Sequence, residues 1–542
     1  MITFGIAIYS ILFTVISLRT SNRIFKFLFI GLALCSEAIY PVITEYFIGL
    51  EGLRLAIIWY LSEDKKSKIT RVKKTLLSYL PYMVIMLGFL YWRLIIFNSD
   101  RPTTDLNQLL DFYQTGSWNL VSSIPLEFLR DLLNSIIFAW FVPAYTYFTN
   151  VLTTDGALSI ILALIISALV VVYINWMDSR DHGLEQDPPE NNYFKTIFWI
   201  GLFATIISMI PFVVSNRQIS FSYGQTTDRY TLVTIMGVIL LILGLIFLIT
   251  KKKGRIILVS VLVFLAILTH YSNMAFFRNG WEDQRQIWWQ LAWRAPQLKE
   301  GTVLMLNPPY ATHYFFGEDY ITWAPADMIY NNVPNTLKIF AQVINTDTIN
   351  DLRQDVPVKR LFRFIYLEFD YSNTLVISMQ DSNTSCLHVL DSKTQELSVN
   401  EPPLVAIAGQ YSNIDQIDLT GTESKPPEII FGKEPEHGWC YYYQKMSLAR
   451  QRMDWKQVVT LGEKAITSQL APMDLSEWMP LIEGYAYTNQ FELANRYIDL
   501  ARQDRNVIYN ICHSILVQLS TMKSELPEEG YEFLYKAFCT HD

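Results

Sequence analysis

The sequence has few charged residues, and it lacks the short motifs of common nucleotide-binding and metal-dependent enzymes. Charged side chains make up 17% of the 542 residues, whereas 51% are hydrophobic and 14% aromatic. The mean hydropathy is +0.20. This composition excludes disordered, collagen-like and coiled-coil proteins, and it is too apolar for an ordinary soluble enzyme. No GxGxxG or GxxxxGK[ST] motif occurs, so the sequence predicts no dinucleotide or P-loop cofactor.

Cysteine and histidine are also scarce, and neither shows the spacing of metal ligands. The five cysteines form no CxxC pair and the seven histidines no HExxH motif, so no metal site is predicted. We interpret His313, His388 and His437 as structural histidines rather than ligands. Cys35 lies in an apolar run. The other cysteines are able to form disulfides in an oxidising compartment, with a pairing that the sequence leaves open: Cys386, Cys440, Cys512 and Cys539.

Long apolar runs dominate the first half of the chain. A run of roughly 17–25 residues is needed to cross about 30 Å of hydrocarbon. Two runs are ambiguous: 47–61 contains Glu51 and Arg54, and 131–148 is interrupted by Pro143. The run at 1–18 lacks a basic start and a small-residue cleavage site, so we expect a retained helix and not a signal peptide. The unambiguous runs are 1–18, 24–43, 76–97, 156–176, 194–214, 230–249 and 256–271.

Basic residues set the expected orientation of these helices. Residues 63–74 carry six lysines and arginines and residues 251–255 read KKKGR, so both loops are predicted to be cytoplasmic. An even number of crossings must separate the two loops, and we therefore interpret 131–148 as an interfacial or re-entrant helix. With 24–43 and 47–61 as an out-and-back pair, about eight crossings result. The C-terminal half is then extracytoplasmic.

The two halves of the chain also differ in net charge. Residues 1–273 carry a net charge of +4 and residues 274–542 one of −12, which together make the total of −8. The predicted fold is mainly α. An acidic outer region argues against nucleic acid as a partner, because phosphate binding requires concentrated lysine and arginine. We expect a polytopic transmembrane domain over 1–273, a Trp-rich interfacial helix over 274–300, a small α/β domain over 301–436 and a helical domain over 437–542.

Tryptophans and strand-like runs characterise the start of the second half. Four tryptophans between 281 and 293 fit one helical face, and indoles favour the membrane–water boundary. A helix lying on the bilayer and a core helix under the next domain are equally good interpretations. A helix is expected near 335–344. Runs typical of strands occur at 303–306, 361–369, 375–379, 387–390 and 404–408.

The last 106 residues contain an internal repeat. Trp455, Val458 and Ala465 recur as Phe491, Ala494 and Ala501, each 36 residues later. This spacing resembles that of the tetratricopeptide repeat, in which paired helices meet at small residues. Helix pairs are expected over 441–467 and 475–502. Because two repeats are few, a packing module is favoured over a peptide-binding groove, and a protein partner at this domain is the alternative.

Ionisable residues near the membrane give the strongest functional signal, since burying an unpaired charge is costly. Glu51 and Arg54 are i,i+3 neighbours and are expected to neutralise each other. Glu37 and Glu45 have no such local partner, and Glu45 lies at a predicted outer turn.

A second charged group, Arg217, Asp228 and Arg229, flanks a predicted outer loop. Arginines at the mouth of a helical bundle suit a phosphate or diphosphate head group, because guanidinium binds phosphate oxygens bidentately. The alternative is that they are anchors at helix ends whose charged heads extend to the membrane surface.

Many helices, charged outer loops and a large outer tail together resemble the C-type glycosyltransferases, integral enzymes that transfer a sugar from a polyprenyl-phosphate donor. Some of them end in tetratricopeptide repeats. The resemblance implies that Arg217 and Arg229 bind the donor phosphate and that Glu45 or Asp228 activates an acceptor hydroxyl. Such enzymes place an acidic catalytic residue in a large first outer loop. Here the only early outer turn is the short one at Glu45, so the resemblance implies that an N-terminal part is missing or that the activity is absent.

The competing hypothesis is a non-catalytic membrane scaffold whose outer α/β and helical domains bind an envelope partner. A transporter is disfavoured, because the sequence shows neither an inverted repeat nor matched Gly/Pro-broken helices.

Overall fold

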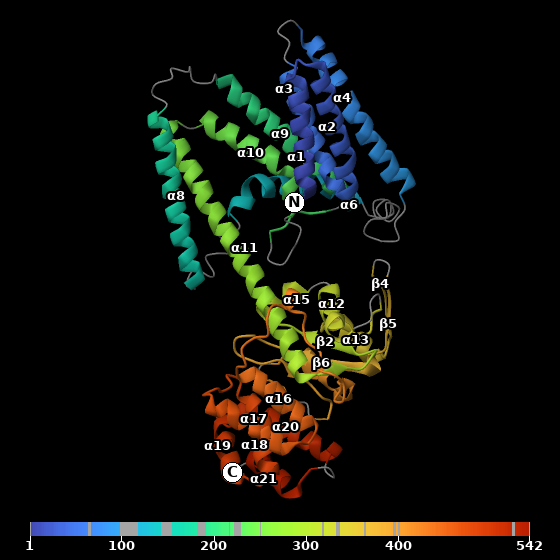
Figure 1. Ribbon diagram of the computed structural model, residues 1–542, viewed down its shortest axis with the longest axis vertical. Coiled ribbons are helices and arrows are strands. Elements are labelled where there is room, and N and C mark those ends of the chain that lie inside the picture. Colours follow the sequence, from blue (N-terminus) through green and yellow to red (C-terminus); the bar gives the residue numbers. More distant parts are fainter. Residues whose placement is uncertain are drawn as a thin grey trace. The chain divides into compact units, whose positions relative to one another are not determined.

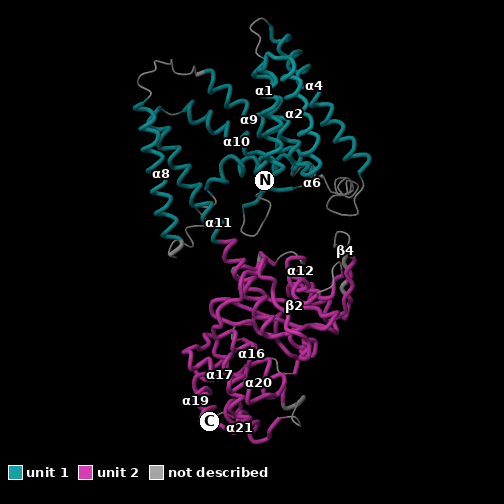
Figure 2. The backbone as a smooth tube through the Cα atoms, in the orientation of Figure 1, with its two compact units in different colours: residues 1–275 teal, residues 276–542 magenta. Residues whose placement is uncertain are grey.

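The structure, a computed structural model, forms two compact units, residues 1–275 and 276–542 (Figures 1 and 2). The boundary predicted from the sequence, after residue 273, lies two residues before the boundary between these units. The residues described are 2–62, 67–97, 118–141, 154–180, 191–215, 217–221, 229–249, 251–316, 319–331, 336–362, 365–393, 397–398, 401–522 and 526–540.

The regular secondary structure in the described residues of the first unit is all helical. Seven helices are long and apolar enough to cross a membrane, which supports the prediction of a multi-pass membrane region. The elements are α1 (Ile2–Arg19), α2 (Arg23–Ile43), η1 (Glu45–Leu50), α3 (Glu51–Leu61), α4 (Lys68–Tyr91), η2 (Trp92–Ile96), α6 (Trp118–Leu133), η4 (Asn134–Phe138), α8 (Thr154–Arg180), α9 (Asn191–Val214), α10 (Thr231–Ile249) and the start of α11 (Lys252–Arg294).

Neither of the two ambiguous apolar runs forms one long, regular α-helix in the described residues. The run at 47–61 is divided between the 3₁₀ turn η1 and the 11-residue helix α3. The run at 131–148 is described as far as residue 141, and there it continues α6 into the π-helical turn η4. Neither is among the seven long apolar helices found in the described residues, which stop at residue 141 within the second run.

Small residues bring the membrane helices close together. A Cβ on Gly237 of α10 would lie 2.6 Å from the Thr205 backbone nitrogen of α9, and one on Gly201 would lie 2.3 Å from the Leu241 nitrogen. Helices in lipid associate by such close packing, because apolar side chains gain nothing by leaving apolar lipid. Gly49 has the same role in η1, since a Cβ there would lie 2.7 Å from the Ser208 backbone. Gly201 and Gly237 thus bring α9 and α10 together, and Gly49 lets η1 lie against α9.

The second unit begins with a small mixed sheet. The central strand β2 (Val303–Asn307) is parallel to β3 (Phe340–Val343) and to β6 (Thr374–Ser378), and β7 (His388–Val389) is antiparallel to β6. Helices α12 (Asp319–Tyr330) and α13 (Thr346–Gln354) belong to the same part of the chain (Figure 1). Helix α14 (Pro403–Gly409) packs on α13 and β6. The remaining elements are the pairs β1 (Gln297–Leu298) with β8 (Ile417–Asp418) and β4 (Val358–Phe362) with β5 (Ile365–Phe369), and α15 (Glu428–Phe431).

Two sequence-based assignments in this sheet region are wrong. Residues 404–408 are helical, within α14, and residues 340–343 of the expected helix form strand β3. Short buried apolar runs have no periodicity that separates helix from strand, so tertiary packing decides their conformation. The strands expected at 303–306, 375–379 and 387–390 are present, and the run at 361–369 folds back as β4 and β5.

The last part of the chain consists of successive helices around a second hydrophobic core. Consecutive helices pack on each other from α16 to α19, and α21 packs on both α18 and α20. The helical elements are α16 (Trp439–Gln451), α17 (Trp455–Thr467), η10 (Leu475–Trp478), α18 (Met479–Tyr487), α19 (Phe491–Ala501), α20 (Arg505–Met522) and α21 (Glu528–Cys539).

The tryptophans before the sheet lie on α11, which runs without interruption from Lys252 to Arg294. Trp288, Trp289 and Trp293 are buried, and Trp288 belongs to the core of the sheet region. Only Trp281 is exposed, to 43%. For three of the four indoles the structure therefore supports the interpretation as a core helix.

Candidate functional site

The turn η1 positions Glu45, which the sequence analysis placed in the candidate site. Glu45 pairs with Arg93 of η2, whose Nε lies 2.8 Å from Glu45 Oε1. The Arg93 side chain is 10% exposed and the Glu45 side chain 46%. The Glu45 carboxylate is thus held by a nearly buried guanidinium group and is still partly exposed at the protein surface.

The next residue of the same turn, Tyr46, contacts the second charged group. The rings of Tyr46 and Tyr230 meet edge-on with centroids 5.1 Å apart. The Tyr46 side chain also interacts with those of Tyr230 and Arg217. Arg229 is exposed, with its guanidinium 5.5 Å from the ring of Tyr230. Two consecutive residues of η1 therefore contact both Arg93 and Arg217, with Arg229 beside them.

The segment that carries Arg217 is fixed from the side. Asn134 of η4 donates from Nδ2 to the carbonyl oxygen of Ile219 at 3.0 Å. Ile219 itself is buried in the core of the first unit. The Arg217 backbone N–H is bound to the carbonyl of Phe212 at 2.8 Å. The turn η4 thus helps to position the segment that carries this arginine. Asp228, the other acidic residue of the predicted site, lies outside the described residues.

A fully buried charge cluster lies next to η1 in the chain. Arg54 of α3 has no exposed surface, and its Nη2 is 2.9 Å from Glu51 Oε1, as expected from their i,i+3 spacing. Arg54 also donates from Nη1 to Thr14 and from Nη2 to Ser10 of α1, both at 2.8 Å. Glu37 of α2 follows at 3.9 Å from Nη1, so the deeper carboxylate also lies beside Arg54.

Two tyrosines complete this cluster. The Tyr40 hydroxyl donates to Glu51 Oε1 at 2.5 Å, and the Arg54 guanidinium lies 4.4 Å from the ring centre of Tyr82 in α4. The cluster joins α1, α2, α3 and α4 on either side of η1. Removing one partner of a buried ion pair leaves the other charge buried and unpaired, which typically costs about 3–5 kcal/mol of stability. We therefore assign the cluster a structural role, which is to hold η1 in place.

The chemistry available around η1 is anion binding next to a carboxylate. Arg217 and Arg229 supply guanidinium groups, which bind phosphate oxygens through paired hydrogen bonds. Glu45 supplies a carboxylate that Arg93 orients, and such a group accepts a proton if a hydroxyl comes within hydrogen-bonding reach. No His, Cys and carboxylate combination suited to a metal ion occurs in the described residues of this unit.

The second unit contains a cavity of about 200 Å³ between the sheet region and the helices. Its charged lining residues pair with each other: Arg450 lies 3.3 Å from Glu483, and Lys393 lies 3.6 Å from Asp415. Burial raises the pKa of Asp391, which also lines the cavity. Because most of its charges are mutually compensated, this cavity is a weaker candidate than the residues around η1.

Sequence reasoning missed Arg93 and Tyr46. Arg93 is the one cation in the apolar run 76–97, and an arginine at membrane depth is itself a signal for a partner. The partner, Glu45, lies 48 residues earlier, so local spacing gives no indication of the pair. Tyr46 gave no signal, since tyrosines are common at membrane surfaces.

Comparison of the chain with family models, with curated proteins and with solved structures finds no match.

Proposed function

We propose that this chain is a multi-pass membrane transferase that moves a sugar from a polyprenyl-phosphate donor to an acceptor on the extracytoplasmic side. One observation carries the proposal: the consecutive residues Glu45 and Tyr46 contact Arg93 and Arg217 respectively. An exposed carboxylate and two arginines thereby lie around one short turn at the end of the membrane helices.

In this proposal each residue has a separate role in one nucleophilic substitution at the anomeric carbon of the donor sugar. The acceptor oxygen attacks that carbon, and its proton passes to the Glu45 carboxylate, which Arg93 orients. The bond to the phosphate oxygen breaks, and the polyprenyl phosphate leaves with the bonding pair. Arg217 and Arg229 stabilise the negative charge of that leaving group. Asp228 remains the second candidate for the base.

The proposed topology has about eight crossings. Seven are the long apolar helices, and the eighth is formed by η1 and α3 together, which are too short to be among those seven. One contact supports the placement of η1 at the opposite end of the bundle from the basic loop 63–74. Glu45 pairs with Arg93 at the far end of α4 from residues 63–74. The site then lies on the outer face.

Disulfides support the extracytoplasmic placement of the second unit. Cys386 pairs with Cys440, and Cys512 pairs with Cys539. Such bonds form and persist mainly in oxidising compartments. Cys35 of the first unit has no disulfide partner.

We also propose that the C-terminal helices are tetratricopeptide-like. The pairs α16–α17 and α18–α19 follow the 36-residue repeat, and the small residues Ala465 and Ala501 are fully buried in both. In this proposal the helices support the outer region and offer a surface for a protein partner. That surface is the basis of the alternative function, a scaffold that binds an envelope partner without catalysis.

The test is sugar transfer in reconstituted vesicles by the full chain and three variants. Glu45→Gln should lower kcat strongly and leave the melting temperature close to wild type, because it keeps size and polarity but removes basicity. Arg217→Ala should mainly raise KM for the donor. Arg71→Gln is the matched control, since Arg71 is an arginine on α4 that stacks on Trp59, away from η1. If the folded wild type transfers no sugar from any polyprenyl-phosphate donor, the scaffold becomes the better explanation.

A further inference from the structure

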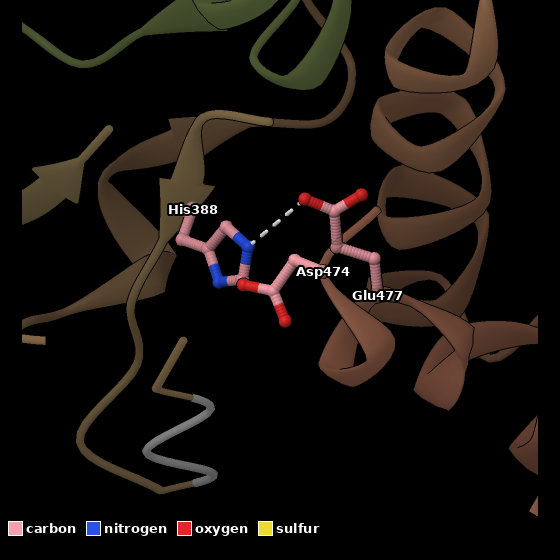
Figure 3. Close-up of side chains that lie close together, drawn as sticks. All are labelled: His388, Asp474 and Glu477. Atoms are coloured by element: carbon pink, nitrogen blue, oxygen red, sulfur yellow. Dashed lines mark ion pairs between the residues drawn. The ribbon is translucent and has the colours of Figure 1, made fainter. Parts of the chain in front are cut away.

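A buried group of three ionisable side chains lies in the second unit, away from the proposed transferase site. His388 of β7, Asp474 before η10 and Glu477 within η10 place one nitrogen and two carboxylate oxygens within 4.8 Å of one another (Figure 3). Their residues are 3%, 9% and 1% exposed. They come from the edge of the sheet and from the helical part, which the chain brings together only on folding.

Hydrogen bonds from the surrounding chain fix the two carboxylates. Glu477 accepts from the backbone N–H of Cys386 at 2.6 Å and from Trp439 Nε1 at 2.7 Å. Asp474 accepts from the N–H of Ser476 at 2.9 Å and from the hydroxyl of Ser398. Supporting donors of this kind orient the ligands in metal sites and tune their basicity. Asp474 Oδ1 also accepts from the Ser476 hydroxyl at 2.7 Å, whereas Asp474 Oδ2 and Glu477 Oε1 accept one hydrogen bond each and keep a lone pair for an ion.

The histidine, by contrast, has no hydrogen bond at either ring nitrogen although it is almost fully buried. Its Nε2 lies 3.5 Å from Glu477 Oε1. That separation is long for a hydrogen bond. It is close to the distance of about 3.4 Å between two ligands that each lie about 2.1 Å from one tetrahedral ion. An unsatisfied imidazole therefore points at two oriented carboxylates with the spacing of shared ligands.

The local charge balance also lacks a cation. Glu401, which accepts from Ser378 at 2.9 Å and has one unbonded oxygen, adds a third carboxylate close to this group. In the described part of the chain no lysine or arginine forms an ion pair with Glu401, Asp474 or Glu477. Buried carboxylates are normally paired with a cation or coordinate a metal.

We propose that His388, Asp474 and Glu477 bind a divalent transition-metal cation, with Zn²⁺ as the best match. The imidazole nitrogen selects against Ca²⁺ and Mg²⁺, which prefer all-oxygen ligands. Because all three ligands are buried, the ion is structural and links β7 of the sheet to η10 of the helical part. Sequence spacing predicted no metal site, because the ligands lie 86 and 89 residues apart and share no motif.

The rival arrangement is an ion pair without metal. Burial alone would lower the pKa of His388, but the facing carboxylates of Glu477, Asp474 and Glu401 raise it to about 9. A protonated imidazole would then supply the missing positive charge, although only one against three carboxylates. Metal and proton compete for the same nitrogen, so a binding measurement separates the two arrangements.

The experiment measures metal content of the full chain, purified through a tag without histidine, stripped with EDTA and dialysed against Zn²⁺. Wild type should retain about one Zn²⁺ per chain above the level of His388→Asn. Zn²⁺ should also raise the melting temperature of wild type and leave that of His388→Asn unchanged. His437→Asn is the matched control, because His437 is an exposed histidine that also pairs with a glutamate, Glu434. That control should bind as wild type does.

A second readout is independent of any variant. Co²⁺ in place of Zn²⁺ should give wild type the visible absorption of a low-symmetry nitrogen–oxygen site, and Zn²⁺ should abolish it. Ca²⁺ should displace neither metal. Equal Zn²⁺ content in wild type and His388→Asn, or a site that Ca²⁺ fills equally well, would overturn the proposal and leave the ion pair.

Discussion

Met453 and Asn489 lie 36 residues apart and share a left-handed backbone conformation, with φ of 55° and 60°. Each residue occupies the turn between the two helices of a pair, Met453 before α17 and Asn489 before α19. The internal repeat therefore extends to the backbone of the turns. Asparagine tolerates this conformation, whereas methionine adopts it at a cost of about 1–2 kcal/mol.

Met453→Gly should stabilise the protein. Glycine removes the Cβ clash, although it loses more backbone entropy on folding, so we expect a net gain of about 0.5–1 kcal/mol. Thermal unfolding of the full chain measures the gain. Met473→Gly is the control, because Met473 is exposed and has no positive φ. A melting temperature for Met453→Gly at or below that of wild type would contradict the prediction.

Ala494→Leu should destabilise the protein. Ala494 is fully buried within α19, and forcing extra methylenes into a packed core typically costs about 1–3 kcal/mol. The neighbouring Leu493 is 37% exposed, so Leu493→Ala should change stability by no more than about 0.5 kcal/mol. Denaturant unfolding of both variants makes the comparison. Equal effects at the two positions would count against the packing of this helix pair.

Asp391→Asn should stabilise the protein at neutral pH but not in acid. Burial raises the pKa of Asp391 above the ordinary 3.8, so the folded state holds this proton more tightly than the unfolded chain. The contribution of this bound proton to the free energy of unfolding is complete below the pKa of the unfolded chain. It is lost as pH rises through the pKa of the folded state. At a pH above the folded-state pKa the wild-type carboxylate is ionised and opposes folding, which asparagine avoids.

Melting temperatures at pH 7 and near pH 4 test the Asp391 prediction. The advantage of Asp391→Asn should shrink on acidification. Asp415→Asn, at a side chain that is 64% exposed, should show little change at either pH. A constant difference between Asp391→Asn and wild type across this range would show that the ionisation of Asp391 is not the cause.

Exchanging the charges of Glu45 and Arg93 should test their contact directly. Glu45→Arg places two guanidinium groups together, so it should lower the yield of folded protein. Adding Arg93→Glu should restore much of that loss, because opposite charges again face each other over the 2.8 Å contact. If the double variant is no more stable than Glu45→Arg alone, the two residues do not pair in the folded protein.

Cysteine labelling in intact cells should confirm the topology. An impermeant thiol reagent is expected to modify Lys393→Cys and to spare Lys66→Cys, both in a Cys35→Ser background. Lys393 has an exposed side chain, so lack of access cannot explain a failure to react. The reverse labelling pattern would place the second unit in the cytoplasm.

The parts of the fold that the sequence predicts are those determined by local physics. Apolar runs of about 20 residues become membrane helices because lipid leaves the backbone no other partner. The repeat predicts α16 to α19 because small residues recur where helices touch. Residues 340–343 and 404–408 were misassigned, since their conformation depends on neighbours in the sheet.

The candidate site was predicted only in part, for the same reason. Glu51 and Arg54 are three residues apart, and their pair follows from helix geometry. Glu45 and Arg93 are 48 residues apart, and His388 and Glu477 are 89 apart. Contacts of that separation arise from the packing of whole elements, which one sequence without homologues does not reveal.

The bond between Cys386 and Cys440 joins the sheet region to the first of the C-terminal helices. Any protease that cuts once between these two cysteines leaves two pieces that stay covalently attached. Such a nicked chain would migrate as an intact one on a denaturing gel until a reductant separates the pieces. Limited digestion followed without reductant would therefore miss cleavage between these two cysteines, including cleavage at the exposed residues 410–411 after α14.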